Sequence, residues 1–262
     1  MSATEVVEFQ KELEQSILFH YLELGDDGNF INAPSTDDEL DEFIRLAYGI
    51  RLPRKIITPG HKSPFDFIAD LFFERVSAAL GFANRNGGKT YSVALLNHLD
   101  MTFKPKCEIA SAGAVKDQAN KCYRYFLEFC ELDWFQRLNE QYLVVTGRPF
   151  YVPDDSTQKK TLFGNGARME IITGTEKGFR GPHPNKARVD EIDELDWNVF
   201  ETGMSMSNSS NGIRAQDVYT STRQNAHGTM QRLIDEAKQR GVTIYEWNVW
   251  EMVDRKSTRL NS

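Results

Sequence analysis

The chain has 262 residues, a formal net charge of −7, and charged and apolar fractions of 26% and 40%, which are ordinary values for a globular protein. This length can bury the core of one large α/β domain or of two small ones. The acidic balance argues against a dedicated nucleic-acid-binding module, which usually carries a basic excess, but it leaves room for contact with DNA through one local patch. No run of about 18 apolar residues is present, so we expect no membrane span. The N-terminus lacks the apolar region of a signal peptide.

The first part of the chain predicts a small set of helices. Apolar residues recur at helical spacing from residue 5 to residue 24, with Glu and Lys between them. Residues 36 to 39 have the pattern of a capping box and open a second helix that runs to about Tyr48. Ser63 and Pro64 predict the start of a third, aromatic-rich helix that runs to Phe73.

From residue 78 onward, short apolar strands alternate with helices. We predict strands at residues 78–83, 107–112, 142–146, 161–163, 168–173, 186–190, 216–222 and 242–247. We predict helices at residues 89–101, 115–130, 197–206 and 229–240. Gly164-Asn165-Gly166 indicates a turn between two paired strands. This alternation predicts an α/β fold with a mostly parallel sheet and helices on both of its faces.

Residues 83 to 90 have the features of a phosphate-binding loop, since they lie between a predicted apolar strand and a predicted helix. Two glycines allow close backbone approach, and the start of the following helix supplies aligned N–H groups. Lys89 can reach the β and γ phosphates of a nucleotide, and the Thr90 hydroxyl can bind Mg²⁺. The first position of this motif is usually Gly and here is Ala83. A Gly-rich turn with an ordinary surface lysine is the alternative. The residues expected to bind ATP are Asn84, Arg85, Asn86, Gly87, Gly88, Lys89 and Thr90.

Two acidic residues, Asp190 and Glu191, follow a predicted strand about 100 residues after Lys89. An Asp at the end of a buried strand can hold Mg²⁺, and a Glu directly after it can orient and deprotonate the attacking water. We therefore predict that Asp190 is a Mg²⁺ residue and Glu191 a catalytic base. Lys186 and Arg188 interrupt the strand, so a solvated acidic helix start is the alternative.

Three hydroxyl residues, Thr220, Ser221 and Thr222, end the next predicted strand. If that strand lies beside the acidic pair, their hydroxyls can sense the γ phosphate and couple its loss to movement. Capping of the following helix is an equally open interpretation.

Two arginines are candidates for catalysis, because phosphoryl transfer gains from a cation placed on the developing charge. Arg85 lies in the phosphate-binding loop, and Arg180 lies between Gly178 and Gly181, upstream of the acidic pair. The flanking glycines predict a loop that can move, as an arginine finger requires. For each arginine, a salt-bridged surface position is the alternative.

The sequence predicts neither a disulfide nor a zinc site. Cys107, Cys122 and Cys130 form no CxxC pair and lie among apolar neighbours, so we expect reduced, packed thiols. The five histidines show no ligand spacing to one another or to cysteine.

In this order, the motifs resemble those of the ATPase domain of the large terminase subunit, the DNA-packaging motor of tailed bacteriophages and related viruses. The resemblance covers roughly residues 59 to 252. The phosphate-binding loop resembles the terminase variant, in which an Arg stands four residues before the Lys, as Arg85 stands before Lys89. Residues 178 to 194 look like the stretch that leads into the acidic pair, and residues 219 to 222 are similar to the coupling motif. Residues 60 to 65 stand where the family has an adenine-contacting segment, although the usual Gln is missing.

The resemblance implies a P-loop NTPase fold of the RecA/ASCE-like kind. Residues 59–254 are then the ATPase core, preceded by a helical segment or lid at residues 1–58. It implies ATP and Mg²⁺ as cofactors, and ATP hydrolysis that drives double-stranded viral DNA into a procapsid. It also implies a portal protein, a small terminase subunit and a homo-oligomeric ring as partners, all in the host cytoplasm. In the family, an arginine from one subunit can complete its neighbour's site, and Arg180 matches the position of that residue.

Two other functions stay open at this point. One is a helicase-like DNA-translocating ATPase outside viruses, and the other is a regulatory module that binds a nucleotide without hydrolysing it. Glu191 argues against the second, because a binding module needs no general base.

The end of the chain fits no predicted element. Residues 256 to 262 resemble a translated sequencing adaptor, so we expect residues 255–262 to be a non-native or disordered tail. In the family an RNase H-like nuclease domain follows the ATPase domain, and this chain stops where that domain should begin. We therefore expect no nuclease activity.

Overall fold

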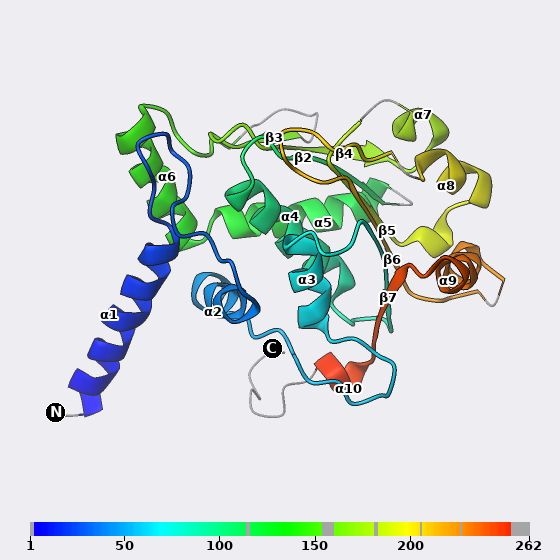
Figure 1. Ribbon diagram of the computed structural model, residues 1–262, viewed down its shortest axis with the longest axis horizontal. Coiled ribbons are helices and arrows are strands. Elements are labelled where there is room, and N and C mark those ends of the chain that lie inside the picture. The colour runs from blue at the N-terminus through cyan, green and yellow to red at the C-terminus, as the bar shows by residue number, and fades with distance from the viewer. Residues whose placement is uncertain are drawn as a thin grey trace.

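The computed structural model describes residues 3–113, 116–153, 160–180, 183–204, 206–225 and 227–252 (Figure 1). The predicted tail at residues 255–262 lies outside these ranges. Within them, a seven-stranded sheet has the order β3-β4-β2-β5-β6-β1-β7. Its strands are β1 (Ala78–Ala83), β2 (Glu108–Gly113), β3 (Lys160–Leu162), β4 (Arg168–Thr173), β5 (Lys186–Asp190), β6 (Gln216–Ser221) and β7 (Thr243–Trp247).

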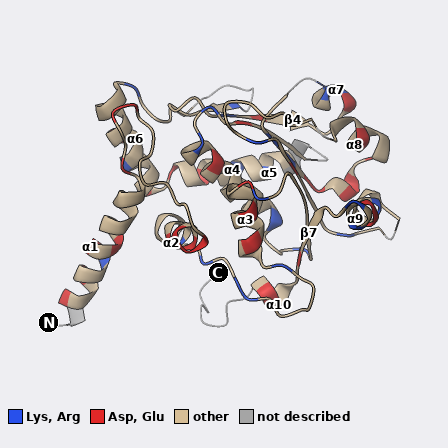
Figure 2. Ribbon diagram, in the orientation of Figure 1, with Lys and Arg blue, Asp and Glu red and all other residues tan. Residues whose placement is uncertain are grey.

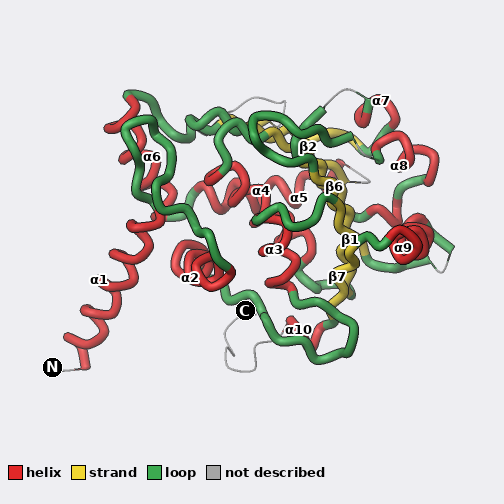
Figure 3. The backbone as a smooth tube through the Cα atoms, in the orientation of Figure 1, coloured by secondary structure: helices red, strands yellow, loops and turns green. Residues whose placement is uncertain are grey.

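Neighbouring strands run parallel except for β3 and β4, which are antiparallel and joined at the predicted glycine turn. The described helices are α1 (Ala3–Tyr21), α2 (Asp37–Tyr48), α3 (Pro64–Phe72), α4 (Lys89–Phe103), α5 (Lys116–Cys130), α6 (Asp133–Thr146), α7 (Glu176–Phe179), α8 (Trp197–Gly203), α9 (Thr229–Arg240) and α10 (Val249–Met252). Helices α3, α4 and α5 cover one face of the sheet, and α8 and α9 cover the other (Figures 1 and 3). The predicted α/β fold, mostly parallel and covered on both faces, is confirmed.

Two of the predicted helix starts have the expected caps. Thr36 and Glu39 form a capping box at α2, and Ser63 and Asp66 form one at α3. Helix α1 extends away from the body of the molecule and packs only through its last turns (Figure 1). The division of the chain at residue 58 stays a prediction.

Acidic and basic residues are interspersed over the described helices and loops (Figure 2). Among the described residues, no helix combines the length and the apolar character that crossing a membrane requires. Cys107, Cys122 and Cys130 are buried and unbridged, as predicted.

The strand predicted at residues 142–146 is wrong. These residues form the last turns of α6, which ends at Gly147 in the left-handed conformation. The Thr146 hydroxyl donates to the Tyr142 carbonyl one turn earlier, and the Tyr142 ring packs against Phe150. Val144 is 85% exposed, so this β-branched run lies on a solvated helix face instead of inside a sheet.

The predicted interruption of the fifth strand by charged residues is also wrong. Lys186 and Arg188 are both fully buried in β5, because each finds an acidic partner far away in the chain. Arg188 Nη2 lies 2.9 Å from Asp100 Oδ2, and Lys186 Nζ lies 2.6 Å from Glu74 Oε1. We call Glu74, Asp100, Lys104, Lys186 and Arg188 the basal charge cluster. Burial raises the pKa of Asp100, but Lys104 and Arg188 outweigh it, so the net shift is downward.

Candidate functional site

The predicted site residues meet at the carboxyl edge of the sheet. β6 pairs on one side with β1, which leads into the phosphate-binding loop, and on the other side with β5, which ends at Asp190. Because these three strands are parallel, their carboxyl ends share one edge. This is the edge at which open α/β sheets bind their ligands.

The loop at residues 84–88 forms a concave backbone surface. Asn86 and Gly88 have positive φ angles of 63° and 72°. A Cβ on Gly87 would lie 2.7 Å from Ala83 Cβ and 2.9 Å from the Asn84 carbonyl oxygen, so no side chain fits there. Gly88 precedes α4 and has no side chain to accept from the N–H groups of the first turn. Such a curved run of N–H groups at a helix start fits the phosphates of a nucleotide.

Lys89 is not a surface lysine. Its side chain lies inside the loop, with Nζ 3.1 Å from the Ala83 carbonyl oxygen and 3.3 Å from that of Asn84. Burial lowers the pKa of Lys89, while the charges of Glu191 and Asp190 oppose this shift. A cation held only by neutral carbonyl oxygens can turn to a phosphate without first breaking an ion pair.

Asp190 is buried and held from two sides by hydroxyl groups. Thr90 Oγ1 donates to Oδ2 at 2.6 Å, and Thr220 Oγ1 donates to Oδ1 at 2.6 Å. These contacts bring together a hydroxyl and a carboxylate, the hard oxygen ligands that Mg²⁺ prefers. The predicted metal residues Thr90 and Asp190 therefore fit this ion.

Glu191 has an unusual backbone for a residue with a side chain, with φ 54° and ψ 46°. Its N–H donates to Asp190 Oδ1, and its Oε2 lies 3.4 Å from the hydroxyl oxygens of both Ser221 and Thr222. Burial, followed by the charge of Asp190, raises the pKa of Glu191, and Lys89 opposes the shift. Left-handed backbone at such a residue is strained and is typical of functional sites. A carboxylate with a raised pKa also suits a general base.

The three predicted coupling residues contact this acidic pair directly. Thr220 donates to Asp190, while Ser221 and Thr222 lie beside Glu191. They are not caps of the following helix, since α9 begins at Thr229 after Gly228.

The other acidic residues of this stretch have structural roles that the sequence did not reveal. The Asp193 carboxylate accepts from the backbone N–H groups of Gln224, Asn225 and Met230. It thereby ties the acidic loop to the segment that follows β6. Asp196 is the N-cap of α8. Only the long-range fold brings Asp193 to its partners, so a sequence pattern carries no signal for them.

The two predicted catalytic arginines lie in different settings. Arg85 lines a hollow of about 540 Å³ together with Thr222, Arg223 and residues 82–84 and 224. The side chain of Arg180 is 69% exposed and pairs with Glu176 on its own helix at 3.2 Å. The described contacts do not bring Arg180 to the acidic pair of this chain.

The interpretation of Gly178 as a hinge needs correction. A Cβ at this position would overlap the Thr173 carbonyl oxygen, so close packing requires the glycine. Gly181 lies outside the described residues.

Residues 60 to 65, which stand where terminases have their adenine-contacting segment, lie beside α10 and β7. His61 Nδ1 is 2.7 Å from Glu251 Oε2, and the Lys62 N–H donates to the Glu246 carbonyl. On the same side of the loop, the Trp247 indole N–H donates to the Gly87 carbonyl oxygen at 2.7 Å. No sequence motif singles out Trp247, because a single tryptophan in a strand usually indicates core packing.

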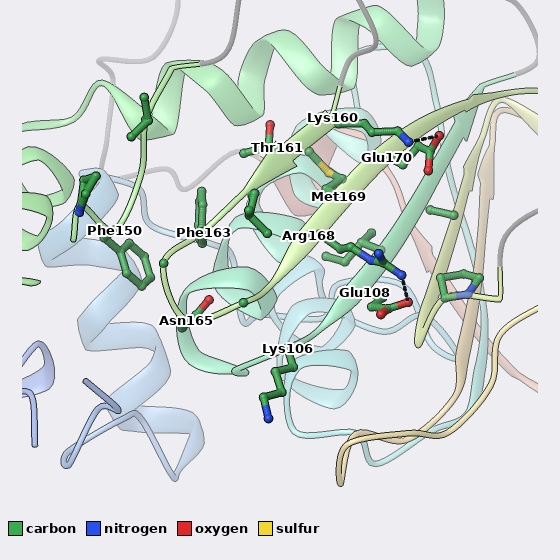
Figure 4. A pocket seen from close by; sticks show the side chains of 18 of the residues that line it. Lys106, Glu108, Phe150, Lys160, Thr161, Phe163, Asn165, Arg168, Met169 and Glu170 are labelled. Carbon is green, nitrogen blue, oxygen red and sulfur yellow. Dashed lines mark ion pairs between the residues drawn. The ribbon is translucent and has the colours of Figure 1, made fainter. Parts of the chain in front are cut away.

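A hollow of about 1050 Å³ lies away from this edge, beside β2, β3 and β4 (Figure 4). Its wall includes the ion pairs between Lys160 and Glu170 and between Arg168 and Glu108. None of the predicted site residues lines it.

Solved structures share the fold of this chain. The large terminase of bacteriophage HK97 superposes with a TM-score of 0.53 at 15% identity, over 80% of this chain and 43% of that protein. A single-substitution variant of the large terminase ATPase domain from Thermus phage P74-26 superposes with a TM-score of 0.53 at 11% identity, over 81% of this chain and 87% of that one. No family model and no curated protein matches the sequence. The chain thus spans less than half of the HK97 protein, and its resemblance to terminase ATPase domains is confirmed as a likeness of the P-loop fold.

Proposed function

We propose that this chain is the ATP-hydrolysing motor domain of a large terminase, which drives double-stranded viral DNA into a procapsid. The observation that carries the proposal is the convergence on Asp190 of hydroxyls from Thr90 and Thr220, with Glu191 directly beside it. A module that only binds nucleotide has no use for a strained, half-buried glutamate next to a Mg²⁺ residue. The arrangement favours hydrolysis.

Each residue then has a distinct task. The N–H groups of the loop and the Lys89 ammonium hold the β and γ phosphates, and Arg85 supports the phosphates from the same loop. Thr90 and Asp190 hold Mg²⁺, which, when bound, neutralises charge on the phosphate oxygens. Glu191 orients the attacking water and takes its proton. Ser221 and Thr222 lie against Glu191, so their hydroxyls can report a change in the γ phosphate.

The proposed partners rest on the likeness of fold, because both superposed proteins are phage large terminases. That likeness favours a packaging motor over a helicase-like enzyme outside viruses. We accordingly propose a homo-oligomeric ring on a portal protein, together with a small terminase subunit, in the host cytoplasm. Such a ring would act on double-stranded DNA.

Glu191→Gln tests the hydrolytic role. The amide keeps the size of the side chain but cannot take a proton, so we expect ATP binding close to that of the wild type and turnover at least ~10²-fold slower. Nucleotide binding and phosphate release are measured on the same preparations. Glu194→Gln is the matched control and should keep its turnover.

If instead Glu194→Gln loses activity and Glu191→Gln keeps it, the base lies in the neighbouring acidic cluster and Glu191 is misassigned. A wild-type protein that binds ATP without turnover, alone and with DNA and portal protein, would favour the regulatory module.

A second test concerns Arg180, because its side chain is 69% exposed and, among the described residues, pairs with Glu176 on α7, a setting that suits donation to a neighbouring subunit. A finger accelerates hydrolysis only if it binds the transition state better than the ground state, and a residue supplied by the neighbour meets this requirement. Arg180→Ala and Glu191→Gln should each be nearly inactive alone. When they are mixed under conditions that allow assembly, some interfaces combine an intact Arg180 with an intact Glu191, so turnover should return.

The control mixes Arg180→Ala with the double variant Arg180→Ala/Glu191→Gln, in which no interface has an intact Arg180. Flat activity across mixing ratios, with assembly confirmed by light scattering, would show that Arg180 acts within its own subunit or only supports structure.

A further inference from the structure

The last strand of the sheet ends against the phosphate-binding loop. β7 pairs with β1 along its length, and Ala83 lies opposite Trp247 in this register. Trp247 is 1% exposed, and its ring packs on Phe67 at 5.6 Å between centroids. Its single polar atom, Nε1, donates to the carbonyl oxygen of Gly87 at 2.7 Å. The buried indole therefore hydrogen-bonds to one particular peptide of the loop, the one that joins Gly87 to Gly88.

The direction of that carbonyl determines the direction of the next N–H. In a planar trans peptide the C=O and the following N–H point in opposite directions. With the Gly87 oxygen held toward Trp247, the N–H of Gly88 points away from Trp247, toward the other side of the loop. This peptide joins two glycines, whose backbones rotate with little steric cost, so the loop itself resists a peptide flip only weakly.

A flip of this peptide would matter for binding. It would turn a carbonyl oxygen, which carries partial negative charge, to the side that now presents an N–H. Anion recognition by a curved backbone depends on presenting N–H groups and not carbonyls.

We propose that Trp247 is a positioning residue of the phosphate-binding loop, and that its indole N–H fixes the Gly87–Gly88 peptide with the N–H of Gly88 directed at the nucleotide phosphates. The inference deepens the proposed function and rests on it.

The segment after β7 holds Trp247 in place. The buried Glu251 carboxylate accepts from the N–H groups of Ile57, Thr58 and Asn248 and from His61. Burial alone raises the pKa of Glu251, but these hydrogen bonds outweigh it and lower the pKa to about 2. The carboxylate is therefore ionised at neutral pH and fastens α10 to the segment before α3.

Met252, the last residue of α10, lies against the same glycine from outside. Its Cε is 2.8 Å from the position that a Cβ on Gly88 would occupy. The loop is thus supported from the β7 side by two side chains, of which only Trp247 donates a hydrogen bond to it.

Trp247→Phe is the first test. Phenylalanine keeps an aromatic ring against Phe67 and removes the donor, so the Gly87–Gly88 peptide is free to turn. The loss of one hydrogen bond that orders the loop corresponds to roughly three- to tenfold weaker binding. We expect the Kd for ATP and ADP and the KM for ATP to rise by this factor, with kcat within about twofold of the wild type. Trp250→Phe, at a side chain that is 69% exposed, is the matched control and should change none of these values.

A second variant covers the possibility that phenylalanine disturbs the core. Benzothienylalanine, incorporated only at position 247, has nearly the shape of tryptophan and lacks the N–H. It should raise Kd and KM by the same factor while the thermal unfolding midpoint stays that of the wild type.

Unchanged Kd and KM in both variants would overturn the inference. A fall in kcat alone, with KM unchanged, would also contradict it, because the peptide is argued to hold the phosphates in the ground state. If the wild type itself fails to bind ATP, the proposed function fails, and this outcome is distinct from the first.

Discussion

Strand β5 carries buried charge at both of its ends, and the two ends differ in how that charge is paired. In the basal charge cluster, cation and anion touch, since Arg188 contacts Asp100 and Lys186 contacts Glu74. At the carboxyl end, Asp190 is held by neutral hydroxyls and Lys89 by neutral carbonyls. Among the described residues, no ion pair joins Lys89 to the acidic pair.

The two parts of β5 therefore have different roles: the paired charges of the basal charge cluster stabilise the fold, and the unpaired charges at the carboxyl end belong to the candidate site. A buried charge without an opposite charge in contact is costly, so a fold keeps one only where something else selects for it. The basal charge cluster is complete without a ligand. The carboxyl end holds a cation and two anions apart, which leaves room for a polyanion with its metal ion.

Lys89→Ala should give the largest effect on activity. Without the main cation on the β and γ phosphates, we expect ATP turnover to be abolished and nucleotide binding to be weakened. The free energy of unfolding should change little, because among the described residues Lys89 Nζ hydrogen-bonds to carbonyls of its own loop and forms no ion pair that would be lost. Phosphate release, equilibrium binding and urea unfolding measure the three quantities. Lys238→Ala, at an exposed position of α9, is the control, and normal hydrolysis by Lys89→Ala would refute the P-loop assignment.

Arg188→Met should give the largest effect on stability. It removes one of the two cations that contact the buried Asp100 carboxylate and leaves Lys104 as the other, so we expect a cost of about 3 kcal/mol in the free energy of unfolding, the lower end for breaking a buried ion pair. Adding Asp100→Leu should restore part of this loss, because the buried carboxylate is removed while Lys104 and Lys186 still contact Glu74. Arg168→Met removes an exposed pair with Glu108 and should cost at most about 1 kcal/mol. If Arg188→Met is as stable as Arg168→Met in urea, the contrast between the two ends does not hold.

The smallest expected effect is on stability at neutral pH, where two neutralising substitutions should change the free energy of unfolding in opposite directions. The pKa of Asp100 is lowered on folding, so this carboxylate stabilises the protein above its unfolded pKa of about 3.9, and the stabilisation is lost as the pH falls through the folded pKa. The pKa of Glu191 is raised, so its ionisation destabilises the folded state as the pH rises from the unfolded value of about 4.3 through the folded pKa. At pH 7, Asp100→Asn should therefore be less stable than the wild type and Glu191→Gln slightly more stable.

Repeated at pH 4, urea unfolding should show the Glu191→Gln difference shrinking, whereas the Asp100→Asn difference should largely persist there and shrink only at lower pH, toward the folded pKa of Asp100. Two variants that shift stability in the same direction at pH 7 would contradict the assignment of one end to structure and the other to function.

Local patterns predicted most of the elements and the site. β1 and β5 have the predicted bounds, because each is a short run between clear loop signals. The motif residues lie at or just after the ends of three parallel strands. The sequence predicted these strands, and the order β5-β6-β1, which the sequence did not predict, brings Thr90, Asp190 and Thr220 together.

The failures share a cause, which is packing and charge pairing in the folded chain that no local pattern encodes. Lys186 and Arg188 made burial of the predicted strand look unfavourable, because their acidic partners lie 112 and 88 residues away. Residues 142–146 are β-branched and apolar like a strand, but they continue a helix whose other face is packed. Gly178 suggested mobility, although the Thr173 carbonyl explains it by packing. None of these contacts leaves a periodic signal in the sequence.

The place of β6 in the sheet determines how the site can respond to its ligand. Its backbone is hydrogen-bonded to β5 on one side and to β1 on the other, so we expect its amide hydrogens to be among the slowest to exchange with solvent. Sliding of this strand would break two ladders at once. The side chains of Thr220 and Ser221 are less restrained, because a χ1 rotation breaks one hydrogen bond at Thr220 and three at Ser221 and leaves both ladders intact. When a ligand at the carboxyl edge changes, we therefore expect these hydroxyls to change rotamer and the loop after β6 to move. The strands of the sheet should keep their positions.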